Sequence, residues 1–132
     1  MIPSRSVRDP SVIGVGIDAV EIDRFRLALQ RTPRLSERLF SDAERAYAAR
    51  RNDPTERLAA RFAAKEAVMK AMGVGLWKFN FRDVEVVRGP LGAPAVKLVG
   101  KAAALAAERG ITEWKLSLTH TERTAQAIAI AL

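Results

Sequence analysis

The sequence predicts an α+β fold in which a largely antiparallel sheet packs against a long central helix. Residues 55–72 carry apolar side chains at helical spacing, which indicates one long amphipathic helix. Two pairs of apolar segments are each joined by a short polar connection, a pattern typical of antiparallel hairpins. These segments span residues 81–87 with 94–99 and 113–120 with 124–132. Repeats, low-complexity tracts and linkers are absent, so we expect a single domain over residues 11–132.

The N-terminal third predicts a strand followed by a helix. Residues 1–10 are polar and basic with two prolines, and we expect them to form a flexible leader. Val12–Ile17 is apolar and β-branched, which predicts a strand that ends at Asp18. Glu21–Gln30 predicts a helix because its apolar side chains recur at helical spacing, and Pro33 then ends it.

Two further helices follow. Ser41 and Glu44 have the spacing of a capping box, so a helix should begin there and end near Asn52–Pro54. The long helix then covers Thr55–Met72, and Gly73 is placed to cap its C-terminus.

The C-terminal half predicts strands, turns and one helix. Phe81–Val87 and Pro94–Val99 flank a turn rich in Gly and Pro, which predicts a hairpin. Gly100–Arg109 predicts a helix. Glu113–His120 alternates apolar and polar side chains, and Thr124–Leu132 is rich in Ala and Ile, so a second hairpin is expected.

Composition limits the classes of partner. The chain has 22 Lys and Arg against 15 Asp and Glu, a formal charge of +7. This excess favours an acidic protein, a phosphate-rich ligand, nucleic acid or an anionic membrane surface as partner. The absence of Cys excludes disulfide and thiolate chemistry. No apolar run approaches the roughly 20 residues of a membrane span and no secretory signal is evident, so we expect a cytoplasmic protein.

The first candidate motif is Gly14–Asp18. Together with Ala19 it also fits the loose dinucleotide-binding pattern G-x-G-x-x-A. That interpretation requires a second parallel strand, whereas residues 31–40 are polar and interrupted by Pro33. We expect instead that Asp18 presents a carboxylate at the rim of the sheet. The alternative is that Asp18 or Ala19 caps the next helix.

The second candidate motif lies on the long helix, where Glu66 is surrounded by cationic residues. Mg²⁺ is commonly bound through one or two carboxylates together with substrate phosphates, so Asp18 and Glu66 are candidate metal ligands. Arg61, Lys65 and Lys70 are candidates for neutralising the remaining phosphate charge. The alternative is an exposed helix face on which Glu66 and Lys70 form an ordinary i, i+4 ion pair.

The third candidate is His120, the only histidine. It follows Leu118 on the apolar face of its predicted strand. The side chain is suited to hydrogen-bond a phosphate, to orient a metal-bound water or to assist proton transfer, and the alternative is a structural histidine. One histidine without any cysteine does not supply an ordinary zinc site.

In this order and spacing, the motifs resemble the holo-acyl-carrier-protein synthase family of phosphopantetheinyl transferases. The resemblance extends from about Ile13 to Ile130, and its most specific part is Ala60–Ala67 followed by Lys70–Gly73. The three segments that carry it are Gly14-Val15-Gly16-Ile17-Asp18, Arg61-Phe62-Ala63-Ala64-Lys65-Glu66 and Ser117-Leu118-Thr119-His120.

The resemblance implies a 4′-phosphopantetheinyl transferase-like fold and a reaction. A serine hydroxyl of apo acyl carrier protein attacks the β-phosphorus of coenzyme A, and adenosine 3′,5′-bisphosphate leaves. In the family, the residues that match Asp18 and Glu66 hold Mg²⁺, and those that match Lys70 and His120 lie at the coenzyme A site. Arg24 matches an arginine that docks the carrier protein. The general base stays open between a metal-bound water, Glu66 and His120.

Length separates two branches of the family, and a chain of one unit resembles the branch that forms homotrimers with active sites between subunits. Asp18 and Glu66 then need not share a subunit with His120. Two segments have no counterpart in the motifs, the leader 1–10 and Trp77–Phe81, which either lines the pantetheine arm or covers the core. The sequence does not decide between fatty-acid and polyketide carriers.

The rival interpretations are non-enzymatic. A pI near 10.5 favours a nucleic-acid-binding module, but aromatic residues are few and no recognised nucleic-acid motif is present. A coenzyme A-binding regulator with an inactive site is the second rival. The intact set of Asp18, Glu66 and Lys70 argues against it.

Overall fold

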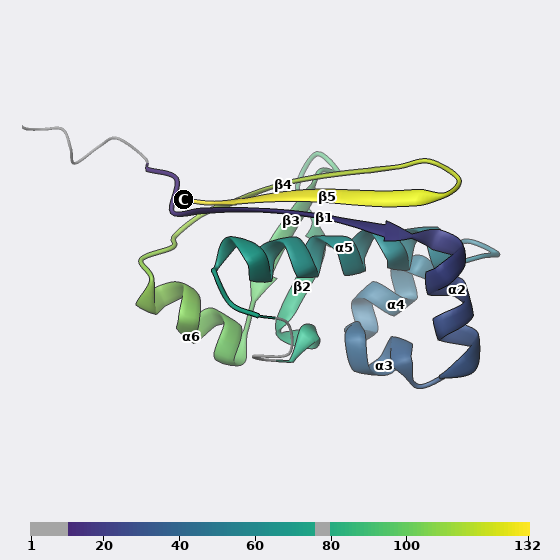
Figure 1. Cartoon of the computed structure of the whole chain (residues 1–132). Coiled ribbons are helices and arrows are strands. Elements are labelled where there is room, and N and C mark those ends of the chain that lie inside the picture. Colours follow the sequence, from purple (N-terminus) through teal and green to yellow (C-terminus); the bar gives the residue numbers. More distant parts are fainter. Residues whose placement is uncertain (1–10, 76–79) are drawn as a thin grey trace, which may run out of the picture.

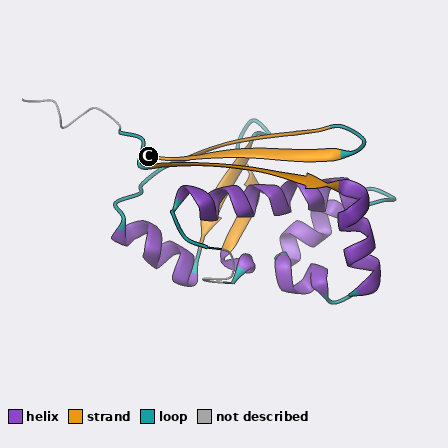
Figure 2. Ribbon diagram, in the orientation of Figure 1, coloured by secondary structure: helices purple, strands orange, loops and turns teal. Residues whose placement is uncertain are grey.

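The computed structural model describes residues 11–75 and 80–132 and has the predicted α+β architecture, with a long central helix against antiparallel strands (Figure 1). One sheet has the strand order β1-β5-β4 and the other pairs β2 with β3 (Figure 2). The leader 1–10 and residues 76–79 lie outside the described part. The elements are β1 (Gly14–Glu21), α2 (Ile22–Arg31), α3 (Leu35–Leu39), α4 (Asp42–Ala48), α5 (Thr55–Ala71), the 3₁₀ helix η1 (Phe81–Asp83), β2 (Val84–Arg88), β3 (Pro94–Leu98), α6 (Gly100–Glu108), β4 (Trp114–His120) and β5 (Thr124–Ala131).

Helix α5 lies directly on the backbone of β1, and two glycines make this approach possible. A Cβ atom at Gly16 would lie 1.8 Å from the carbonyl oxygen of Ala67, and one at Gly14 would lie 1.8 Å from that of Ala71. Both positions face the helix, so any side chain there would force the helix off the strand. The next strand, β5, presents four buried alanines on the same side of the sheet. They are Ala125, Ala127, Ala129 and Ala131.

The register of β1 corrects the expected position of Asp18. The strand continues beyond Asp18 to Glu21, because β5 pairs antiparallel with it as far as Glu21 opposite Thr124. Asp18 therefore lies within the strand opposite Ala127, and not at its end. It does not cap α2, since the residue before that helix is Glu21. Within the described residues β1 pairs only with the antiparallel β5, which excludes the dinucleotide-binding interpretation.

The helices α2 to α4 lie at one end of α5 (Figure 1), and aromatic contacts join α2 and η1 to this helix. Phe62 of α5 stacks on Phe25 at 5.2 Å and on Phe81 at 5.4 Å between ring centroids. Phe40 meets the edge of Phe25 at 6.3 Å. The predicted capping box at the start of α4 is present, but α3 has no sequence signal of its own because it is only five residues long.

Both predicted hairpins are confirmed, with one change at the start of the first. Residues 81–83 form the turn η1 and not the beginning of a strand, because Asn80 caps this turn by accepting a hydrogen bond from the backbone of Arg82. Strands β2 and β3 then pair from Val84 opposite Leu98. In the second hairpin, β4 pairs with β5 along its whole length.

The face of the β1-β5-β4 sheet that points away from α5 carries exposed apolar side chains on β1 and the adjoining part of β5. On β1 the side chains that alternate with the glycines are Val15 and Ile17, which are 55% and 63% exposed. Ile128 of β5 is opposite Ile17 in the register and is 37% exposed. Exposed apolar side chains that adjoin on a sheet face are typical of an interaction surface.

The packing of α5 on β1 predicts that Gly16→Ala lowers the free energy of unfolding by about 2 kcal/mol or more, because the new methyl group collides with backbone that cannot rotate away. Urea unfolding followed by circular dichroism measures this change. Gly75→Ala is the matched control, since no atom of the described residues outside its chain neighbours lies within 4 Å of a Cβ at Gly75. If both variants unfold at the same urea concentration, the close contact is not a constraint on the fold.

Candidate functional site

Asp18, Glu66 and Lys70 meet where β1 crosses α5. The ammonium of Lys70 lies 2.9 Å from Oδ1 of Asp18 and donates to the carbonyl oxygen of Ile17 at 3.1 Å. The Asp18 side chain is only 14% exposed, whereas that of Lys70 is 50% exposed. Glu66 lies one helical turn before Lys70 on the same side of α5. The structure thus brings together three of the residues that the sequence predicted.

The two carboxyl groups interact strongly. The pKa of Glu66 is raised to about 8, first because the side chain is partly buried and then because it hydrogen-bonds to Asp18 and is repelled by its charge; the nearby Lys70 opposes this rise. Two carboxylates that share one site do not both ionise freely. Without a cation between them, the pair therefore holds a proton near neutral pH.

This donor set fits Mg²⁺. Two carboxylates that repel each other in a partly buried position, next to room for other ligands, match an ion that prefers oxygen and keeps several waters. Among the described residues no group of three or more His, Asp or Glu gathers, so a cage built by the protein alone is absent from this part of the chain. The pair is therefore suited to a metal that is completed by substrate phosphates.

An apolar pocket of about 430 Å³ opens beside Glu66. Its walls come from β1, α2, α3 and α5. Arg24 stands at this pocket, with its side chain 85% exposed and an ion pair of 3.6 Å to Glu21. The lining residues are Ala19, Val20, Glu21, Arg24, Phe25, Ala28, Leu35, Leu39, Phe62 and Glu66.

His120 and Arg61 belong to a different pocket, between α4, α5 and β4. It has a volume of about 230 Å³. His120 is exposed, and its Nδ1 lies 3.3 Å from the carbonyl oxygen of Thr121. Strand β5 separates it from Asp18, because Asp18 is opposite Ala127 and His120 is opposite Ala125 on the other edge. The structure therefore does not bring His120 to Asp18 and Glu66 within one chain.

Four arginines surround the ring of Tyr47 in and beside this second pocket. The guanidinium carbons of Arg57 and Arg61 lie 4.2 Å and 4.3 Å from the ring centroid, and those of Arg88 and Arg50 lie 5.4 Å and 5.7 Å away. Arg88 also donates to the phenol oxygen at 2.8 Å.

This concentration of positive charge affects both Tyr47 and Arg61. Burial alone would raise the pKa of Tyr47, but the charges of the neighbouring arginines lower it overall. Arg61 is buried, and its Nε has no hydrogen-bond partner within the part of the chain that the structure describes. A convergence of guanidinium groups around a neutral ring, with one donor unused, is suited to bind an anion. We name Arg50, Arg57, Arg61 and Arg88 with Tyr47 the arginine cluster.

Lys65, a predicted phosphate-binding residue, lies in the core and lines neither of these pockets. Its side chain is 0% exposed, and its ammonium forms an ion pair of 2.8 Å with the buried Glu44. It also donates to the carbonyl oxygens of Phe81 and Val84. All three ammonium protons are used, so none is available for a phosphate. Periodicity did not show this burial, because the helical row that contains Lys65 turns into the core between α4 and β2.

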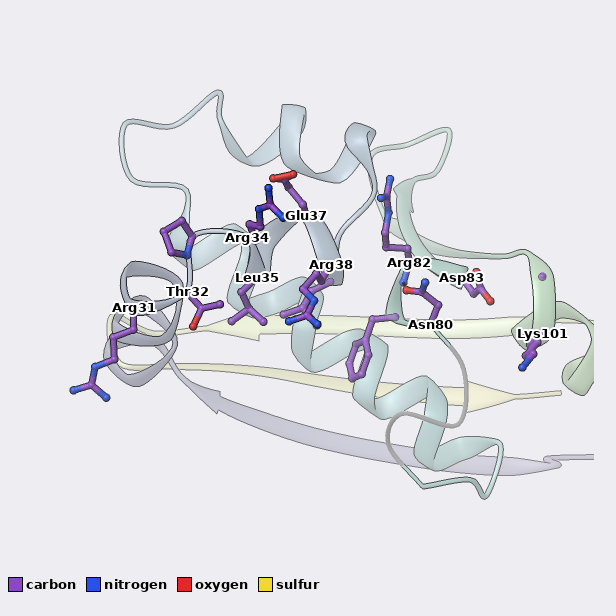
Figure 3. A pocket seen from close by; sticks show the side chains of 14 residues that line it. Arg31, Thr32, Arg34, Leu35, Glu37, Arg38, Asn80, Arg82, Asp83 and Lys101 are labelled. Atoms are coloured by element: carbon purple, nitrogen blue, oxygen red, sulfur yellow. Dashed lines mark hydrogen bonds between the residues drawn. The ribbon is translucent and has the colours of Figure 1, made fainter.

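A basic groove, which the sequence did not reveal, lies between α3 and η1 (Figure 3). It is wide, with a volume of about 1620 Å³, and positive side chains line both walls. Its cations come from segments far apart in the sequence, and only the run of arginines after α2 hinted at it. They are Arg31, Arg34, Arg38, Arg82 and Lys101. No helix of the described ranges is long and apolar enough to span a membrane.

This fold and site define the class of protein. Residues 14–131 match the family model of the 4′-phosphopantetheinyl transferase superfamily, and the chain belongs to this superfamily. Within it the chain is an enzyme of the holo-[acyl-carrier-protein] synthase type. The synthase of Desulforudis audaxviator is 49% identical over 122 residues, which is 92% of this chain and 93% of that protein.

Solved structures agree with this assignment. The holo-[acyl-carrier-protein] synthase of Neisseria meningitidis superposes with a TM-score of 0.84 at 30% identity, over 92% of this chain and 99% of that one. A synthase–CoA complex from Chronobacterium ammoniagenes has a TM-score of 0.79 at 35% identity, over 89% and 95% of the two chains.

The Asp18–Glu66 pair predicts a pH dependence of stability in metal-free buffer. Because the pKa of Glu66 is raised from 4.5 to about 8 in the folded protein, its contribution to stability is fully present below pH 4.5 and is lost as the pH rises through 8. The melting temperature should therefore fall more between pH 5 and 8.5 in the wild type than in Glu66→Gln. Comparing the two proteins cancels the titration of other groups, and equal slopes would contradict the coupled pair.

Proposed function

We propose that this enzyme transfers 4′-phosphopantetheine from coenzyme A to a serine of apo acyl carrier protein in a Mg²⁺-dependent reaction. The observation that carries the proposal is the Asp18–Glu66 carboxylate pair with Lys70 held 2.9 Å from Asp18. Relatives that are named for this activity, and one solved as a complex with CoA, support it.

The reaction exchanges the phosphoanhydride bond of coenzyme A for a phosphodiester bond to the carrier serine. The serine oxygen of the carrier forms a bond to the β-phosphorus of coenzyme A, and the bond from that phosphorus to the bridging oxygen breaks. Adenosine 3′,5′-bisphosphate leaves with the electron pair, and the serine proton passes to a base. Glu66 and His120 are both candidates for this base, as is a water at the metal.

The residues of the first site position and neutralise the reacting pyrophosphate. Phosphoryl transfer asks a protein mainly for positioning and for stabilisation of charge on oxygen. Lys70 is half-exposed and already lies against Asp18, so its ammonium can reach a phosphate oxygen placed at the carboxylate pair. Mg²⁺ held by Asp18 and Glu66 supplies Lewis-acid stabilisation of the phosphate oxygens.

The arginine cluster binds a further phosphate of coenzyme A. Since the carboxylate pair is suited to the metal and the pyrophosphate, the 3′-phosphate is the anionic group that remains for the cluster. Arg61 and His120 both line the cluster's pocket, so these two predicted coenzyme A ligands are kept here. Lys65 is omitted because it is buried.

One coenzyme A does not need to reach both pockets of a single chain, since the enzyme is proposed to form a homotrimer. Glu66 and His120 line separate pockets, divided by β5 and α5. The exposed apolar face that contains Val15, Ile17 and Ile128 gives a surface for association. The metal site of one subunit would then lie beside the arginine cluster of the next.

The carrier protein docks on the side of α2 and α3. Arg24 stands at the apolar pocket beside Glu66, and the basic groove continues from the end of the same helix. Acyl carrier proteins are acidic, so this positive surface and the net charge of +7 favour their encounter. We place the reaction in the cytoplasm, where it would activate carriers of fatty-acid synthesis. A nucleic-acid-binding module has less support, because that function has no use for the carboxylate pair.

Removal of the metal carboxylate should abolish catalysis without unfolding the protein. Glu66→Ala is expected to lower kcat by a factor on the order of 10³, because one of two metal ligands is lost. Carrier modification followed by intact-mass spectrometry measures the rate. Glu108→Ala, on the exposed face of α6, is the control and should be unaffected. Near-normal activity of Glu66→Ala would reject the metal assignment.

A site formed between subunits predicts that two different inactive variants restore activity when they assemble into mixed oligomers. Inactive Glu66→Ala and His120→Ala proteins, unfolded together and refolded as a mixture, should recover measurable activity, because some interfaces then pair two intact half-sites. Refolding each variant alone provides the control. A mixture that stays inactive, although mixed oligomers form, places both residues in the same subunit's site.

The arginine cluster predicts selective loss of affinity for the 3′-phosphate. Arg57→Gln should raise KM for coenzyme A by about tenfold, the value of one charge-assisted contact, and should change KM for dephospho-coenzyme A very little. Arg109→Gln removes the same charge from an exposed position outside the cluster. If Arg57→Gln raises KM equally for coenzyme A and for dephospho-coenzyme A, the arginine cluster does not bind the 3′-phosphate.

The basic groove predicts an electrostatic defect in carrier binding. Arg34→Glu should lower kcat/KM for the carrier by about tenfold at low ionic strength and weaken its salt dependence, because steering of the acidic partner is reduced. KM for coenzyme A should stay constant. Arg109→Glu has the same change of charge away from the groove. An equal loss in both variants would show that net charge, and not the groove, attracts the carrier.

A further inference from the structure

Lys65 occupies the centre of a buried polar network beneath the catalytic end of α5. Its ammonium reaches three oxygens that belong to two different segments of the chain. It pairs with Oε1 of Glu44 at 2.8 Å, and it donates to the carbonyl oxygens of Phe81 at 3.0 Å and Val84 at 2.5 Å. The ring of Phe40 lies 5.4 Å below the same ammonium. Both charged side chains are 0% exposed, so this is a fully desolvated ion pair.

Glu44 extends the network to two further backbone groups. Its Oε1 accepts the backbone N–H of Ser41 at 2.9 Å, as the capping box requires, and its Oε2 accepts the backbone N–H of Val86 at 2.9 Å. Ser41 in turn donates its hydroxyl to Glu85. The start of α4 and the first residues of β2 are therefore tied to one point on α5.

That point has a particular relation to the proposed site. Lys65 immediately precedes Glu66 in α5, so the direction in which Lys65 is anchored sets the rotation of the helix at Glu66. The segments held by Lys65 also form the walls of the basic groove, because Phe81 and Leu39 both line it. Lys65 binds Phe81 directly, and Leu39 lies just before Ser41, which begins the capping box of α4. One buried ammonium thus fixes groove and carboxylate relative to each other.

We propose that Lys65, through its ion pair with Glu44, is a positioning residue that holds Glu66 in register with Asp18 and with the basic groove. The inference rests on the proposed Mg²⁺ role of Glu66. A buried ion pair is a poor source of stability, since apolar residues of similar volume often serve as well or better. Its use here is geometric, because three directed contacts allow only one orientation of the helix.

Residues that orient a metal ligand have a measurable signature. Loss of such a supporting contact commonly lowers metal affinity or activity by roughly 10- to 100-fold, although the metal-binding residue itself is unchanged. A residue that only supports the fold lowers stability and leaves the metal affinity of the folded molecules unchanged. Variants of a positioning residue and of a purely structural residue that lose the same stability should therefore differ in their affinity for the metal.

The experiment compares wild type with the double variant Glu44→Gln/Lys65→Met, which removes both charges together and leaves neither buried charge unpaired. We expect a cooperative thermal transition, an increase of about tenfold in the Mg²⁺ concentration that gives half activity, and a fall of about tenfold in kcat. KM for coenzyme A should not change. The rise in melting temperature that Mg²⁺ produces should also require about tenfold more Mg²⁺, and this readout does not depend on catalysis.

Val68→Ala is the matched control, because Val68 is a fully buried residue of α5 that takes no part in the network. It should lower the melting temperature and leave the Mg²⁺ dependence unchanged. If the double variant does not fold, Glu44→Asp decides the question, because it keeps both buried charges and shortens the carboxylate that meets Lys65. A raised half-activating Mg²⁺ concentration is expected. Wild-type Mg²⁺ dependence in the network variants, or the same defect in Val68→Ala, would overturn the inference.

The thermal readout also separates the inference from the proposed function. A wild-type protein that is stabilised by Mg²⁺ but transfers no phosphopantetheine would reject the proposed reaction and still leave the shift in Mg²⁺ affinity to be compared. A wild-type protein that neither binds Mg²⁺ nor transfers the group would reject both.

Discussion

The contact on which the rest of the structure depends is that between helix α5 and the bare backbone of β1. Gly14 and Gly16 leave room for the carbonyl oxygens of Ala71 and Ala67, so no layer of side chains separates strand from helix. Asp18 follows Gly16 on the same face of the strand, and Glu66 precedes Ala67 on the helix. The same close approach therefore brings the two carboxyl groups together, and the fold and the candidate metal site have one cause.

The charged groups of the candidate sites lie on two different sides of α5. On the β1 side of α5 lie the carboxylate pair and Lys70, and on the β4 side lies the arginine cluster around Tyr47. A metal-bound pyrophosphate suits the first site and a lone phosphate suits the second. The groove beside α3 is lined by five cations and two carboxylates, so its lining has a positive balance that an acidic partner would meet.

The sequence predicted most of the elements because their signals are local. The capping box of Ser41 and Glu44, the alternation in β4 and the turn residues of both hairpins act over a few residues, and each is present in the structure. Asp18, Glu66 and Lys70 were also predicted as one site, although the motif resemblance and not periodicity united them.

What the sequence could not show depends on contacts between distant segments. Lys65 and Glu66 are neighbours in α5, yet one is buried against Glu44 and the other faces Asp18, and Ala-rich sequence on both sides of the helix conceals which face is covered. The arginine cluster joins α4, α5 and β2, and the groove joins α3, η1 and α6. Helix α3 is too short to have a signal of its own.

The central claim is that the carboxylate pair supports metal-dependent transfer of phosphopantetheine to a carrier serine. The most direct test is intact-mass analysis of apo acyl carrier protein after incubation with this enzyme, coenzyme A and Mg²⁺, with EDTA in a parallel reaction. The account predicts a gain of one phosphopantetheine mass that is lost with EDTA. No gain on any of several fatty-acid and polyketide carriers by folded enzyme, or a gain that persists in EDTA, would contradict it.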